Sequence, residues 1–199
     1  GAPFERGLWF DAVTQLGRIR MVDQRRDVDL RGDDPHIWLS PGRLAVQART
    51  VADALSQADP THRALYEGNL ESLLAELTDL DMALRLRLRP FTGREFFVFH
   101  PSWGYFAGDY DLVQVAVEVG GREPSDSELT ELQRRAREAK VKTVFVQPQI
   151  HGRGARAFAA SIGAKVGILD PLAENVAANL EATARKLQQA FEEASGNGQ

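Results

Sequence analysis

The sequence predicts an α/β protein whose C-terminal lobe holds a four-stranded, mostly parallel sheet flanked by helices. After Pro90, short apolar runs alternate with amphipathic helical segments, which is typical of a parallel sheet covered by helices. Before Pro90, leucines spaced mostly three and four residues apart predict one long helix that joins this lobe to another. Only a remnant of that other, N-terminal lobe is expected in this chain.

Residues 1–34 are expected to form that remnant and a loop. Apolar residues at helical spacing predict a helix over Leu8–Leu16, and Arg18–Asp23 reads as a short strand. One helix and one strand cannot bury their own apolar faces. The polar stretch Gln24–Asp34 has no apolar pattern and predicts a loop.

Residues 35–90 are expected to hold a motif loop, a helix and the long strut helix. Ser40-Pro41 predicts a helix start, with a hydroxyl N-cap and proline at the first helical position, and its apolar stripe ends near Ala58. The leucines that follow predict a helix of about 28 residues, ~42 Å long, ended by Pro90. No sustained charge pattern favours a coiled coil, so we expect a strut between two lobes.

Residues 91–195 are expected to form the C-terminal α/β lobe. The expected strands are Glu95–His100, Val113–Val119, Thr143–Gln147 and Lys165–Leu169. The expected helices are Ser102–Tyr110, Ser125–Lys140, Arg153–Ile162 and Ala173–Ala194.

The composition narrows the classes of function. With 43% hydrophobic and 26% charged residues, the chain has the profile of a globular protein rather than a disordered one. A formal net charge of −4 gives no reason to expect a nucleic-acid partner. Because the chain has no cysteine, disulfides, thiolate metal sites and a cysteine nucleophile are excluded. A bound metal must use imidazole, carboxylate or water.

Polar residues follow three of the expected strands. His100 stands between the apolar run of the first strand and Pro101, which cannot continue a ladder, while His151 and Asp170 follow later strands. Open α/β sheets bind ligands at the carboxyl ends of their strands. Two histidines and a carboxylate suit Zn²⁺ or Mn²⁺. Their spacing matches no compact metal signature, so a histidine that merely caps its strand stays open as the alternative.

Other chemistry-bearing residues have ordinary explanations beside the functional one. His62 falls in the first turn of the long helix and reads as a solvated surface residue. Gly152-Arg153-Gly154 can hold an anion at a helix start, although turn chemistry is the commoner reason for such glycines. Three carboxylates near the expected site edge are weaker ligand candidates, more typical of solvated or capping residues; they are Asp109, Glu118 and Glu123.

Four ordered motifs carry a family resemblance. They are Asp34–Pro41 (DPHIWLSP), Phe97–Phe106 (FVFHPSWGYF), Val144–Gln149 (VFVQPQ) and Leu169–Leu172 (LDPL). Together they resemble the zinc-uptake solute-binding family, the metal-binding proteins of zinc and manganese ABC importers, from about Pro3 to Phe191.

The resemblance implies two α/β lobes joined by one rigid helix, with the metal held between them. It implies that His36 and His100 are imidazole ligands and that Asp170 is a carboxylate ligand. Manganese-type members tend to carry glutamate where His100 stands, so Zn²⁺ is expected, with Mn²⁺ as the alternative. The family's first histidine ligand is expected to precede this chain's motifs. The His-rich acidic loop of some members is absent, since Gln24–Asp34 contains no histidine.

The resemblance also implies a role: a periplasmic or membrane-anchored extracellular component that delivers a metal ion to a membrane permease, and not an enzyme. A surface adhesin of the same fold is one alternative, and a metal-dependent hydrolase is another, although no glutamate stands out as its general base. If the first lobe is largely missing, the apolar neighbourhood of Trp103, Tyr105 and Phe106 is expected to be exposed and to drive homo-oligomer formation.

Overall fold

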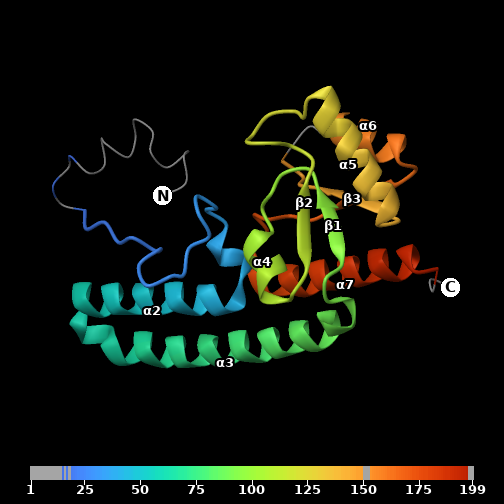
Figure 1. Cartoon of the computed structure of the whole chain (residues 1–199). Helices are drawn as coiled ribbons and strands as arrows, with labels where there is room; N and C mark the ends of the chain where they lie inside the picture. The colour runs from blue at the N-terminus through green and yellow to red at the C-terminus, as the bar shows by residue number, and fades with distance from the viewer. Residues whose placement is uncertain (1–14, 16, 18, 150–152, 197–199) are drawn as a thin grey trace. The chain divides into compact units, whose positions relative to one another are not determined.

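The structure of the protein is a computed structural model that describes residues 15, 17, 19–149 and 153–196 (Figure 1). The chain divides into two compact units, the first ending at Asp81 and the second beginning at Met82. The helix expected over Leu8–Leu16 falls almost entirely outside the described residues.

The expected strand near residue 20 is the one element of the first unit that the structure contradicts. Residues 19–23 belong to no strand, because no described segment pairs with them. The following loop is confirmed. It contains a turn in which the Arg26 backbone N–H donates to the Asp23 carbonyl at 3.2 Å.

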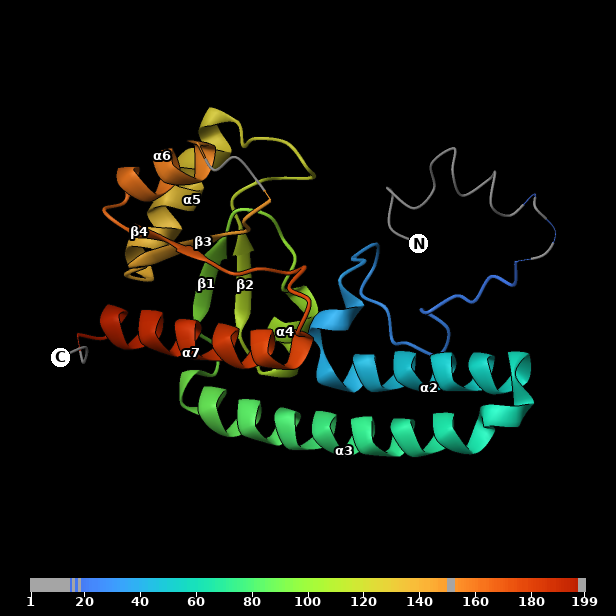
Figure 2. The same cartoon turned by 180° about the vertical axis from the view of Figure 1, so that it is seen from behind.

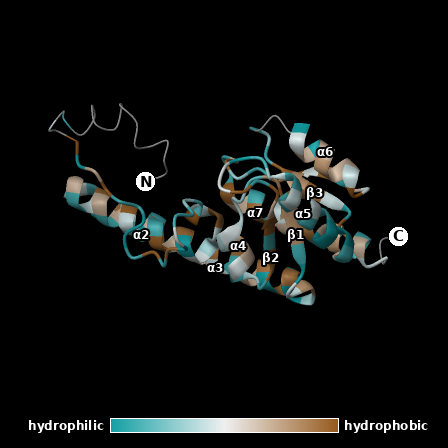
Figure 3. Ribbon diagram, turned by 45° about the horizontal axis from the view of Figure 1, so that its top comes forward, coloured by the Kyte–Doolittle hydropathy of each residue, from teal (hydrophilic) through white to brown (hydrophobic). Residues whose placement is uncertain are grey.

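Helix α2 (Pro41–Ala58) begins where the sequence predicts. The Ser40 hydroxyl accepts a hydrogen bond from the Arg43 backbone N–H at 3.3 Å, and Pro41 occupies the first helical position. The short 3-10 helix η2 (Ile37–Leu39) precedes it, with Ile37 and Leu39 buried. Hydrophobic and hydrophilic residues alternate in bands along α2, as expected for an amphipathic helix (Figure 3).

The long helix is present as α3 (Arg63–Leu88), 26 residues or ~39 Å. A 3-10 helix, η3 (Pro60–His62), takes the place of the expected first turn, so α3 begins slightly later than predicted. It ends before Pro90, which lies in η4 (Arg89–Phe91). Within the described part of the chain, no helix is both long and apolar enough to cross a membrane.

All four predicted strands form in the second unit, and all are parallel. They are β1 (Glu95–Val98), β2 (Val113–Ala116), β3 (Thr143–Val146) and β4 (Lys165–Ile168). Their order is β2-β1-β3-β4, so β1 and β3 are central and β2 and β4 lie at the edges. Each strand is one to three residues shorter than predicted, although single backbone hydrogen bonds continue beyond the strand ends, as from the Leu169 N–H to the Val146 carbonyl at 3.0 Å.

Helices cover both faces of this sheet (Figures 1 and 2). One face carries α5 (Asp126–Glu138) and α6 (Arg153–Ser161), and the other carries α4 (Gly104–Asp109) and α7 (Val176–Ala194). Phe97, Val144 and Phe158 belong to one buried cluster on the α5–α6 side. Because side chains alternate along a strand, the neighbouring buried residue Val98 faces the opposite layer.

The aromatic segment after β1 corrects one expectation. Trp103 is 2% exposed, and Tyr105 and Phe106 are 0% exposed, so they form no apolar surface. They are interior residues of the second unit: the Trp103 and Phe106 rings meet edge to face with centroids 5.7 Å apart. The prediction that these aromatic residues form an exposed apolar surface was therefore wrong, and homo-oligomer formation was expected only because of that surface.

Candidate metal centre

The strand order places a topological switch point at the carboxyl ends of β1 and β3. From β1 the chain crosses to β2 on one side, whereas from β3 it crosses to β4 on the other. The connections therefore leave in opposite directions between these two strands, and open α/β sheets bind ligands at such a switch point. His100 lies two residues beyond the end of β1, at this position.

The His100 ring is held by a carboxylate from the neighbouring strand. Its Nδ1 lies 2.5 Å from Glu118 Oε1. The contact follows from register: Val98 pairs with Ala116, and His100 and Glu118 each come two residues later. The Glu118 backbone N–H continues this pairing by donating to the Phe99 carbonyl at 3.1 Å. A carboxylate only accepts hydrogen bonds, so it fixes the imidazole proton on Nδ1 and leaves the lone pair on Nε2.

Asp170 follows β4 at the same edge of the sheet, as predicted. Its Oδ1 accepts hydrogen bonds from Gln149 Nε2 at 2.8 Å and from the Leu172 backbone N–H at 3.0 Å. The side chain is half-buried and aligned by the turn that Pro171 begins. The structure thus brings His100, Glu118 and Asp170 to one edge of one sheet.

His36 belongs to the first unit and has a similar local arrangement. Its backbone N–H donates to Asp34 Oδ1 at 3.0 Å, and its ring Nδ1 lies 2.7 Å from the same oxygen. The side chains of both residues are mostly buried, 14% and 19% exposed. The Asp-Pro-His turn therefore also holds its imidazole by Nδ1, and a carboxylate there favours the tautomer with the proton on Nδ1.

The other two histidines differ. His62 makes the same kind of contact, with Nδ1 2.7 Å from Asp59 Oδ2, but its side chain is 59% exposed at the start of α3. This agrees with the predicted surface role. His151 lies outside the described residues. Within the described ranges, no three histidine or acidic side chains are gathered closely enough to hold a metal ion by themselves.

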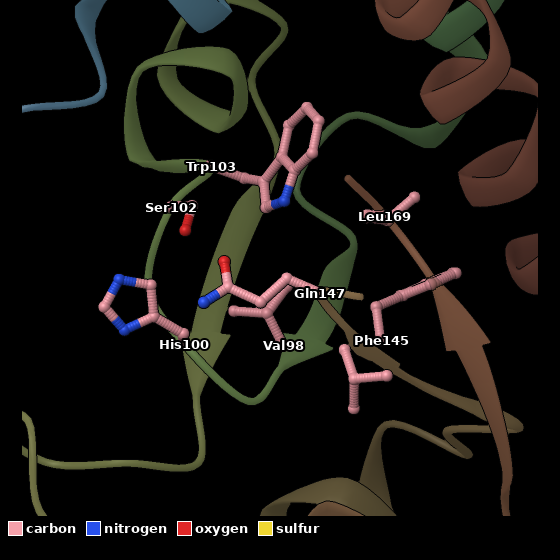
Figure 4. A pocket seen from close by; sticks show the side chains of 8 residues that line it. Val98, His100, Ser102, Trp103, Phe145, Gln147 and Leu169 are labelled. Carbon is pink, nitrogen blue, oxygen red and sulfur yellow. The ribbon is translucent and has the colours of Figure 1, made fainter. Parts of the chain in front are cut away.

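A small cavity lies directly beside His100 (Figure 4). Its volume of about 10 Å³ is close to the space one water molecule needs. The Ser102 side chain lines it and is 1% exposed, and its Oγ has no hydrogen-bond partner among the described residues. Gln147, from the end of β3, lines the same cavity with its amide group. The cavity beside His100 is therefore narrow, and its polar groups come from His100, Ser102 and Gln147 among apolar neighbours.

A larger cavity of about 240 Å³ is lined in part by Glu118. Glu123, Arg122 and Arg153 also line it, so its charges are mixed and do not define an anion site. Arg122 donates to both carboxylate oxygens of Glu128 at 2.9 Å.

Asp109 ends α4, immediately before β2 begins. Asp109 therefore lies near the amino-terminal end of β2, whereas His100 and Asp170 lie at the carboxyl ends of their strands. It is no longer a ligand candidate.

Sequence reasoning ranked Glu118 too low and overlooked Asp34. Asp34 stands two residues before His36 with a proline between them, a local signal that was available. Glu118 is 18 residues from His100, so nothing local connects them. Only the register of the two parallel strands places them together.

Comparison with known proteins decides the family. The profile of the family described as zinc-uptake complex component A, periplasmic, matches residues 5–194. The chain belongs to this family. A crystal structure of a ZnuA protein superposes with a TM-score of 0.89 at 40% identity, covering 96% of this chain and 78% of that one.

Two curated relatives are also zinc-uptake or metal-binding proteins by name. The high-affinity zinc uptake system protein ZnuA of Bacillus subtilis is 32% identical over 141 residues, 70% of this chain and 44% of that protein. A putative metal-binding protein of Treponema pallidum is 32% identical over 144 residues, 71% of this chain and 46% of that protein. The chain thus spans less than half the length of these two relatives. The α/β fold with a parallel sheet is shared with the solved ZnuA structure.

Proposed function

We propose that this chain is the metal-binding part of a zinc importer of the ABC type. In this role it binds Zn²⁺ outside the cytoplasmic membrane and passes the ion to a membrane permease. The family description and the names of the B. subtilis and T. pallidum relatives support this class of function. His36, His100 and Asp170 are the proposed ligands.

The observation that carries the proposal is the arrangement of His100. It stands at the switch point of the sheet with Nδ1 held by a carboxylate. Imidazoles that bind metals are usually oriented in this way, with the second ring nitrogen donating to a carboxylate or carbonyl. His36 has the same orientation through Asp34, which supports its assignment as a second imidazole ligand.

The donor set favours zinc over manganese. Two neutral imidazoles and one carboxylate, completed by a further ligand, suit tetrahedral Zn²⁺. Mn²⁺ prefers more oxygen donors and a higher coordination number. We therefore expect Zn²⁺ to bind more tightly than Mn²⁺ when both compete with a chromogenic chelator for the chain. Equal affinity for the two ions would contradict the ligand assignment.

The test of the site uses three histidine variants under the same titration. His36→Ala and His100→Ala should each weaken Zn²⁺ binding by more than about 100-fold, since altering a hydrogen-bond partner of a ligand alone costs ~10–100-fold. His62→Ala is the matched control: it removes an imidazole with the same carboxylate contact from an exposed position, and affinity should stay unchanged. Equal losses in all three variants would mean nonspecific surface binding and would refute the proposal.

The alternative functions have less support. The family description and the curated relatives named above refer to zinc uptake and metal binding, so the adhesin alternative is not favoured. The same names describe transport and binding proteins and give no support to a hydrolase. Self-association likewise receives no support from these comparisons.

A further inference from the structure

We propose that Glu118 is a positioning residue for metal binding: it holds His100 in the tautomer and ring orientation that present Nε2 to the ion. The inference rests on the proposed function, because it concerns how one of the proposed ligands is prepared.

The contact is a product of the fold rather than of local chain geometry. Asp34 and His36 are two residues apart in one turn, so their contact needs only that turn. Glu118 and His100 are 18 residues apart and follow neighbouring strands. They meet because Val98 pairs with Ala116 and each of the two residues comes two positions after its strand's paired residue. The Glu118 side chain is only 11% exposed, against 32% for His100, so the carboxylate is more deeply buried than the ring it contacts.

The chemistry explains why this support matters. A neutral imidazole in water favours the tautomer with the proton on Nε2, which cannot bind a metal through that atom. A carboxylate beside Nδ1 reverses the preference, because it accepts the Nδ1 proton in a hydrogen bond and has none to donate. It also raises the basicity of the ligand nitrogen. Without Glu118, metal binding must first move the proton and orient the ring.

The larger cavity supplies a matched control. Glu123 lines the same cavity as Glu118 and carries the same charge, and no described hydrogen bond or ion pair joins it to His100. Removing either carboxylate changes the charge at that cavity equally. Only the removal of Glu118 should change the state of the His100 ring.

The experiment measures Zn²⁺ affinity and the His100 tautomer in the whole 199-residue chain. Zn²⁺ itself is the probe, and the imidazole ¹⁵N shifts of the folded, metal-free protein report the tautomer. Glu118→Ala should weaken binding by ~10–100-fold and shift His100 towards the Nε2-protonated tautomer. Glu118→Gln keeps an acceptor oxygen but adds an N–H donor, so it should lose less affinity than Glu118→Ala and shift the tautomer only in part. Glu123→Ala should change neither measurement.

The His100→Ala variant distinguishes a failure of the proposed metal site from a failure of the positioning role of Glu118. If His100→Ala leaves Zn²⁺ affinity unchanged, the proposed metal site itself is wrong. The positioning role is refuted, while the metal site stands, if His100→Ala weakens Zn²⁺ binding but Glu118→Ala does not. It is also refuted if Glu118→Ala weakens Zn²⁺ binding and leaves the His100 tautomer unchanged. In the double variant, Glu118→Ala should add no further loss, because its effect passes through His100.

Discussion

Replacing Gly167 with alanine tests the packing of the strand that leads to Asp170. Gly167 lies in β4 opposite Phe145 of β3. A Cβ at this position would lie 2.8 Å from Cδ1 and Cε1 of Phe145 and 2.8 Å from Cγ2 of Thr143. Carbon atoms pack at about 3.5–4.0 Å, so all three contacts are too close. Phe145 is 3% exposed and Thr143 is 6% exposed, so neither side chain can move aside into solvent.

The magnitude follows from two opposing effects. Overpacking of a buried site costs about 1–3 kcal/mol. The reduced conformational entropy of the unfolded chain returns about 0.4–1 kcal/mol when glycine becomes alanine. We therefore expect Gly167→Ala to lower the free energy of unfolding of the second unit by about 1–2 kcal/mol.

Urea unfolding followed by circular dichroism and tryptophan fluorescence measures this change. Gly68→Ala in α3 is the control, because a Cβ there has no atom within 4 Å and lies in a helix. That variant should gain up to about 1 kcal/mol from helix propensity. A Gly167→Ala protein as stable as the parent chain would refute the steric reasoning, since it would show that β3 and β4 separate at little cost.

Two further predictions concern polar groups of the second unit. Thr143→Val should raise the free energy of unfolding by about 1 kcal/mol in the same urea experiment, because the buried Thr143 Oγ1 has no hydrogen-bond partner among the described residues; a loss of stability would reveal a partner. Hydrogen bonds from Arg122, followed by those from Ser125, lower the pKa of Glu128 to about 2 from its ordinary value of 4.5. The stabilisation from Glu128 is therefore present above pH 4.5 and is lost as the pH falls towards 2. Arg122→Ala should raise this pKa in an NMR titration of the carboxyl carbon, and an unchanged value would exclude Arg122 as the main cause.

The sequence predicted the secondary structure of the second unit closely because each element there has a local cause. Proline follows the polar ends of three strands, and Ser125 with Glu128 forms a capping box at the start of α5, where a helix was expected. The prediction of a short strand near residue 20 was wrong because a strand needs a pairing partner, and a local sequence pattern does not reveal one. The expected exposed aromatic surface was wrong for a related reason: Trp103 and Phe106 are buried, and their burial depends on tertiary packing that the local pattern does not reveal.

The site was predicted in part. Proline placement and strand alternation located His100 and Asp170 at one edge of the sheet, and the structure confirms that placement. Glu118 was undervalued because its position depends on the pairing of β1 with β2, and neither strand specifies that register locally. The ligand roles of His36, His100 and Asp170 stay predictions, to be tested by the metal titrations.

The strand order makes the two proposed ligands of the second unit unequal in rigidity. β1 is paired on both sides, and the Phe99 backbone N–H, beside His100, donates to the Phe145 carbonyl at 2.8 Å. β4 lies at an edge of the sheet and pairs only with β3 among the described strands, and Ile168 within it is 52% exposed. Local opening of a sheet begins where fewest bonds must break, so amide hydrogens of β4 should exchange with solvent before those of β1. When β4 opens, Asp170 loses the support of the strand that precedes it, whereas the backbone beside His100 stays paired. An ion held by these two proposed ligands would then lose its contact with the carboxylate before its contact with the imidazole.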